Sequence, residues 1–387
     1  MWNGLLSTVA VIAAAALVLS QHNASDWSYL AEGGAPFRLL ILAALLRLGV
    51  YPLPGSFKRR WDIYLASLCA GGALWIRLAS LATALPSSHL LITIGGGALL
   101  VTGLLAAFAP DFSTALPYIL LNGTAAMVLG PVVEPRAGVA TALVWVINLT
   151  LCLALLRMDV QIRPLAPLGQ KVRIPFGIAL GSLAGAPLTL GFVAHWLFLR
   201  LCWSNGARPL VWIGAISWAL ITLPMWPRLR LIRRELNLAH APRRNIWLAF
   251  SCATLTAALL IVLGVAPSLL RSINIGSAFA LDLAYLKGWL WPGWLTFLVL
   301  AFLTVLAPLP ASYFFSSPAT RFLQRIGHWL DLVSALLELE WLYLGLARVG
   351  ERLGYLTSLT LIAIEEAFYL GWTLVWGLVL VLYFLEL

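Results

Sequence analysis

Long apolar runs constrain this chain more than any other feature of its sequence. A helix needs about 20 consecutive apolar residues to cross a bilayer core, and on that rule we count about eleven candidate spans. They cover residues 3–20, 37–54, 63–84, 90–109, 114–131, 138–157, 175–202, 209–226, 246–266, 289–309 and 364–385. Hydrophobic residues make up 61 % of the chain and charged residues 10 %, too few charges to coat a soluble surface. The sequence therefore predicts an all-α membrane protein, a polytopic helical bundle.

Positive charge is concentrated in every second loop between the expected spans. These basic loops cover residues 58–60, 157–173, 228–244 and 321–325. Positively charged loops stay on the cytoplasmic side of a membrane, so the N-terminus is expected in the cytoplasm and the C-terminus on the opposite side of the cell's inner (cytoplasmic) membrane. The net charge of +10 then reflects topology and contact with the lipid bilayer, not nucleic-acid binding. The four cysteines lack a metal-ligand spacing, so we expect neither a metal site nor a disulfide framework.

The segment before the last span has a different pattern. Between residues 320 and 356, apolar residues recur at helical spacing with many charges between them. This pattern is typical of an amphipathic helix that lies along the membrane or along a neighbouring helix. We therefore expect a transmembrane bundle over residues 1–310, an amphipathic lateral helix over 311–360 and a C-terminal anchor helix over 361–387.

Few ionisable side chains lie inside the spans, and each is a functional candidate because charge within a bilayer is costly. His195 follows a stretch containing Gly185, Pro187 and Gly191, which we expect to break the helix and free backbone carbonyls that can hold water. A histidine exchanges protons near neutral pH, although a buried histidine bonded to the backbone is the structural alternative. Arg47 either supplies a fixed positive charge beside a hydrated path or reaches from the span to the interface.

The same stretch carries a family resemblance. The segment SLAGAPLTLGFVAHW at residues 182–196 resembles the pattern S-L-A-G-x-P-P-x-x-G-F-x-x-K. That pattern marks the antiporter-like subunits of respiratory complex I, membrane-bound hydrogenases and Mrp-type cation/proton antiporters. Here Leu188 stands in place of the second proline, and His195 stands in place of the lysine.

Further segments resemble the same family, in the same order along the chain. In LLRLGVYPLPGSF, Arg47 takes the position of a family lysine and Pro52 that of a proline. Asp111 in APDFSTALPY matches a family aspartate, and Asn148 in INLTLCLALL stands where the family has a histidine. LELEWLYLGLARVG, at residues 337–350, is similar to a stretch near the C-terminus of the Mrp and hydrogenase relatives.

The resemblance implies a fold of two inverted five-helix repeats, each with a broken helix. This chain begins near the family's sixth helix, so the first repeat is expected to be incomplete and the second complete. It also implies a subunit of a hetero-oligomeric membrane complex that translocates protons or cations. Redox chemistry would lie on partner subunits of an NADH:quinone oxidoreductase-like or hydrogenase-like complex, so this chain would be no catalyst alone and hold no cofactor.

The implied proton or ion path runs through His195, Arg47, Asn148 and Asp111, with helix breaks at Pro52 and at residues 185–191. Most positions that carry lysine in the family are neutral here, which leaves a second reading open. The chain is then a structural subunit that keeps the fold and does not conduct. An unrelated small-solute carrier is a third reading, and it requires a polar pocket at the middle of the membrane.

Overall fold

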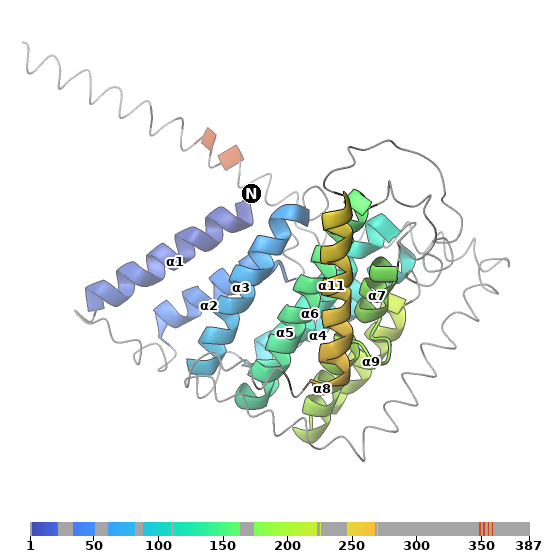
Figure 1. Cartoon of the computed structure of the whole chain (residues 1–387). Helices are drawn as coiled ribbons and strands as arrows, with labels where there is room; N and C mark the ends of the chain where they lie inside the picture. The colour runs from blue at the N-terminus through green and yellow to red at the C-terminus, as the bar shows by residue number, and fades with distance from the viewer. Residues whose placement is uncertain are drawn as a thin grey trace, which may run out of the picture. The chain divides into compact units, whose positions relative to one another are not determined.

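The structure is a computed structural model that describes residues 2–21, 34–50, 61–81, 88–109, 112–162, 174–222, 225, 246–267 and 269, with a few positions between 348 and 358. The described residues form ten helices and are all-helical (Figure 1). The helices are α1 (Trp2–Gln21), α2 (Ala35–Leu48), α3 (Trp61–Leu81), α4 (Ser88–Phe108), α5 (Phe112–Val133), α6 (Pro135–Ile162), α7 (Ile174–Leu183), α8 (Leu190–Ser204), α9 (Arg208–Thr222) and α11 (Ile246–Val265).

These helices overlap the first nine of the expected spans. Four of them, α4, α5, α6 and α11, contain segments long and apolar enough to cross a membrane by themselves. The expected spans at 289–309 and 364–385 and nearly all of the expected amphipathic helix lie outside the described residues. The all-helical class is therefore confirmed for the described part of the chain, whereas the count of about eleven spans and the inverted repeat stay predictions.

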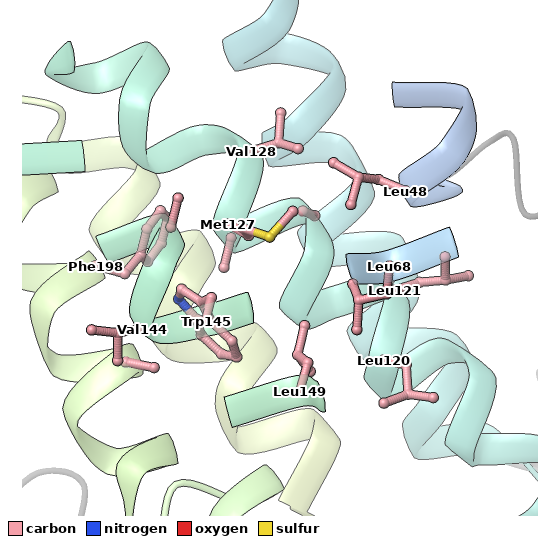
Figure 2. Packing of buried hydrophobic residues seen from close by; sticks show 14 of the residues in the cluster. Leu48, Leu68, Leu120, Leu121, Met127, Val128, Val144, Trp145, Leu149 and Phe198 are labelled. Carbon is pink, nitrogen blue, oxygen red and sulfur yellow. The ribbon is translucent and has the colours of Figure 1, made fainter. Parts of the chain in front are cut away.

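Helix α6 lies at the centre of the packing. It contacts α3, α5, α7, α8 and α11. Figure 2 shows part of this core, in which Trp145 and Leu149 of α6 lie among side chains of α5 and α8 such as Met127 and Phe198. Helix α6 also carries Asn148, one of the predicted path residues, and this side chain is fully buried.

The outer helices differ from α5 and α6 in what their apolar surface faces. In α5, 89 % of the apolar segment is buried inside the bundle, against 28 % in α11. Large side chains on the outer face of α11, such as Leu248 and Leu255, are exposed. An exposed apolar face of this kind suits contact with lipid tails, in keeping with a protein embedded in a membrane.

The turn between α5 and α6 holds these two helices together. Glu134 is the one residue between them, and its carboxylate accepts a hydrogen bond of 2.6 Å from the backbone N–H of Ala137. This contact caps the first turn of α6, and Pro135 at its start needs no hydrogen-bond acceptor for its nitrogen. Gly138 then packs directly on the carbonyl of Gly130, so the two backbones approach closely.

The chain divides into two compact units, Met1–Ser334 and Ala335–Leu387. All ten helices belong to the first unit. The expected domain boundaries near residues 310 and 360 fall outside the described residues, so the three-part division stays a prediction.

Candidate functional site

The helix expected over residues 175–202 consists of two helices, α7 and α8, joined by residues 184–189. Gly185 lies in this connection with φ of +70°, a conformation that glycine adopts without strain. A Cβ at Gly185 would overlap the indole of Trp218, so the connection also needs glycine for space. Gly191, in the first turn of α8, lies against the carbonyl of Ser182 and has no room for a Cβ either.

The carbonyl groups at the end of α7 accept hydrogen bonds from within the protein. Gly181 O accepts from the N–H of Ala186 at 2.7 Å, and Ser182 O accepts from the N–H of Gly185 at 3.0 Å. Ala184 O accepts from the indole N–H of Trp218 at 2.7 Å. Each carbonyl oxygen has two lone pairs, so these bonds satisfy the end of α7 and leave a second lone pair on each oxygen.

His195 lies one turn into α8 and is 6 % exposed. Its Nδ1 lies 2.8 Å from Gly191 O, and because a carbonyl only accepts hydrogen bonds, Nδ1 carries the hydrogen in the neutral ring. Its Nε2 then presents a lone pair, and no protein donor reaches it within the described part of the chain. The ring stacks on Trp218 with centroids 3.9 Å apart and meets Trp145 edge-on at 4.6 Å.

A chain of hydrogen bonds connects His195 with Asn148 of α6. The hydroxyl of Ser182 donates to Asn148 Oδ1 at 2.6 Å and accepts from the N–H of Gly191 at 3.0 Å. Gly191 O in turn accepts from His195 Nδ1. Asn148 Nδ2 is buried and has no acceptor among the described residues. The link therefore joins α6, α7 and α8, and each end carries an unpaired polar atom.

The structure places Arg47 elsewhere, in the last turn of α2. Its Nε donates to Ser7 Oγ at 3.1 Å and its Nη2 to Thr8 Oγ1 at 3.5 Å. Both hydroxyls belong to the early turns of α1, so the guanidinium lies near one end of that helix. A cation in the last turn of α2 also offsets the negative end of the helix dipole. Across the described residues, no hydrogen bond connects Arg47 with Asn148 or His195.

Two of the four predicted path residues, His195 and Asn148, thus belong to one site, whereas Asp111 and Pro52 lie outside the described residues. Sequence reasoning did not single out Trp145 and Trp218, which enclose the imidazole. Trp145 stands three residues before Asn148, and this helical spacing places both on one face of α6. Within the described ranges, no three His, Cys, Asp or Glu side chains come together to hold a metal ion.

No protein-family model and no curated protein matches the sequence. Among solved structures, the chain is similar to a chain in the structure of the Mrp complex from Dietzia sp. DQ12-45-1b, with a TM-score of 0.61 and 20 % sequence identity. The two chains share a fold. The similarity covers 90 % of this chain and 43 % of that chain, so this chain spans less than half the length of that relative.

Proposed function

We propose that this chain is a membrane subunit of a multisubunit, Mrp-like cation/proton antiporter assembly, and that it contributes to ion translocation at the break between α7 and α8. The observation that carries the proposal is the hydrogen-bonded link from Asn148 through Ser182 and Gly191 to His195. A buried titratable group beside a broken helix, in a fold shared with a chain of the Mrp complex, fits an ion path better than simple packing.

His195 is the proposed proton carrier in this site. Its Nε2 lone pair can accept a proton while Nδ1 stays bonded to Gly191 O. The resulting imidazolium stacks on the indole face of Trp218, and aromatic faces attract cations. A side-chain amide is neither protonated nor deprotonated at neutral pH, so Asn148 acts by holding the Ser182 hydroxyl, which in turn holds Gly191.

Arg47 and Asp111 have other proposed roles. A guanidinium stays protonated in proteins, so Arg47 changes the local potential and cannot pass protons on. Asp111 remains a path candidate through its match to a family aspartate alone. We further propose that the complete assembly contains other membrane subunits, and that any redox chemistry, as in complex I-related or hydrogenase-like complexes, takes place on them.

A second candidate function is a structural subunit that keeps this fold without conducting. The enclosure of the His195 ring favours it, because Trp145 and Trp218 lie on the ring and the side chain is almost fully buried. A path for protons must open past one of these indoles. The two functions therefore differ in whether removing the imidazole changes ion flux.

Purification in mild detergent followed by reconstitution tests the assembly. We expect other membrane subunits to co-purify, and vesicles with the complex to exchange protons for Na⁺ or K⁺ along an imposed cation gradient. The matched control is the complex purified from cells that lack this chain. Proton movement that requires an electron donor and no cation gradient would favour a complex I-related assembly, and a chain that purifies alone would contradict the proposal.

We also propose that the amphipathic segment at 311–360 and the anchor at 361–387 attach the bundle to its partners. In the segment at 311–360, large apolar residues recur at helical spacing with many charges between them. This segment therefore suits an interface rather than a span. Deleting everything after Pro318 should reduce the yield of the assembly while residues 1–318 still insert into the membrane. Full assembly of the truncated chain, measured by co-purification, would contradict this role.

A further inference from the structure

A second buried polar cluster joins three helices at a distance along the chain from the break. Asn122 of α5 has its Nδ2 at 2.8 Å from Leu99 O, 3.0 Å from Thr102 Oγ1 and 2.5 Å from Ser217 Oγ. The Ser217 hydroxyl also donates to Leu99 O at 2.7 Å. Asn122, Thr102 and Ser217 are all buried. We call these residues, with the carbonyl of Leu99, the Asn122 cluster.

The Asn122 cluster lies at a close contact between α4 and α9. A Cβ built on Gly103 of α4 would lie 2.7 Å from Ser217 Oγ and 3.1 Å from Ser217 Cα. Gly96 lies two turns earlier on α4, and a Cβ built on it would lie 3.1 Å from Leu210 Cδ2 of α9. The glycines allow backbone contact, and small residues let membrane helices pack closely in this way. Since apolar contacts alone permit sliding and rotation, the hydrogen bonds of Ser217 give α9 a defined rotation against α4 and α5.

The residue after Ser217 is Trp218, which belongs to the candidate site. Its indole N–H donates to Ala184 O at the end of α7, and its ring stacks on His195 at 3.9 Å with an interplanar angle of 20°. Consecutive helical residues point about 100° apart, so one rotation of α9 sets both side chains. A rotation that releases Ser217 from Asn122 therefore moves the indole away from the imidazole and from Ala184.

We propose that Asn122 is a positioning residue, which acts through Ser217 and the rotation of α9 to hold the Trp218 indole on His195 and on the end of α7. The placement of Trp218 is a structural claim that holds whether or not the chain conducts. The consequence for ion flux rests on the proposed function, because it requires His195 to carry protons.

The ¹⁹F NMR signal of Trp218 in 5-fluorotryptophan-labelled protein tests this placement in the full chain in detergent. The chain has 18 tryptophans, so Trp218→Phe assigns the signal by its loss. In the parent, His195→Leu should shift the signal because the imidazole ring lies on the indole. In an Asn122→Leu background, the same His195→Leu change should shift the Trp218 signal by roughly half as much or less. Substitutions of residues that share a network have coupled effects of this kind.

Ser217→Ala tests the same link from α9 with a smaller change, so the proposal stays testable if Asn122→Leu does not fold. Thr124→Val is the matched control on α5. Its hydroxyl is buried and donates only to Leu121 O of its own helix, at 2.8 Å, so the Trp218 signal and its response to His195→Leu should stay as in the parent. Exchange of the Trp218 indole N–H with deuterium should speed up roughly tenfold in Asn122→Leu or Ser217→Ala and stay unchanged in Thr124→Val.

A Trp218 signal that keeps its full response to His195→Leu in Asn122→Leu, or in Ser217→Ala, would overturn the proposal. The same change in Thr124→Val as in Asn122→Leu would overturn it as well, because it would show a general loosening of α5. Ion flux is measured in parallel. A parent without flux would contradict the proposed function and leave the NMR result to decide the positioning role, whereas flux without a change at Trp218 would contradict the positioning role alone.

Discussion

At the scale of single residues, His195 has one nitrogen that is bonded and one that is open. The bond from Nδ1 to Gly191 O fixes the ring, and Ser182 fixes Gly191 from the other side through its N–H. Ser182 also donates to Asn148, so its hydroxyl connects Asn148 with the backbone of Gly191. Its hydroxyl therefore determines how the imidazole is held.

Ser182→Ala should lower the free energy of unfolding by about 1–2 kcal/mol, because it leaves the buried N–H of Gly191 without a partner and Asn148 Oδ1 with only the weak S–H donor of Cys152, at 3.7 Å. Ser182→Thr keeps the hydroxyl and should lose less. The matched control is Thr141→Val on α6, whose buried hydroxyl donates only to Ala137 O of its own helix. Thermal unfolding in detergent measures all three, and equal midpoints for Ser182→Ala and Thr141→Val would show that the link contributes nothing.

At the scale of elements, the connection between α7 and α8 contains an unusual backbone conformation at Leu188. Its φ is +69°, and its side chain is 66 % exposed. A residue with a Cβ is strained there, by about 1–2 kcal/mol relative to glycine. The family pattern has a proline at this position, but a proline ring holds φ near −65°. The connection in this chain therefore differs from one that contains the second proline.

Leu188→Gly should raise the midpoint of thermal unfolding, because glycine adopts a positive φ without strain and the lost side chain is exposed. Leu188→Pro should lower the midpoint, and it should lower the free energy of unfolding by about 2–3 kcal/mol, since the proline ring cannot adopt this conformation. Gly97→Ala on α4 is a control substitution at a site with open space around the glycine, and it should be neutral or stabilising. Leu188→Pro with parent stability would show that the connection has another conformation.

Within the described residues, the positions of the helices could be predicted from the sequence, whereas the contacts that build the site could not. Apolar runs of about 20 residues locate spans because the bilayer imposes that length. Glycines and a proline at residues 185–191 stand where α7 ends and α8 begins. The stacking of Trp218 on His195 joins helices that are separate in sequence, and no local period predicts it. Asn122 likewise reads as one polar residue in an apolar run until its partners on α4 and α9 are known.

At the scale of the whole molecule, the basic loops predict an orientation in the membrane. The loops at 58–60 and 228–244 together carry nine of the 25 Lys and Arg residues and should both face the cytoplasm. Lys58→Cys and Arg234→Cys, each in a chain without its four native cysteines, should then resist a membrane-impermeant maleimide in intact cells and react after lysis. Labelling of both cysteines from outside the cell would contradict the predicted orientation. Labelling of one alone would contradict the expected number of spans between the two loops.

The proposed function requires that ions cross this chain at His195. Proton flux driven by an imposed Na⁺ or K⁺ gradient, in vesicles that contain the purified assembly, tests this most directly. We predict that His195→Ala abolishes this chain's share of the flux while the assembly stays intact, that His195→Lys keeps part of it, and that Arg47→Ala has a smaller effect. Flux equal to that of the parent in His195→Ala, with equal amounts of intact complex, would contradict the account and identify the chain as a structural subunit.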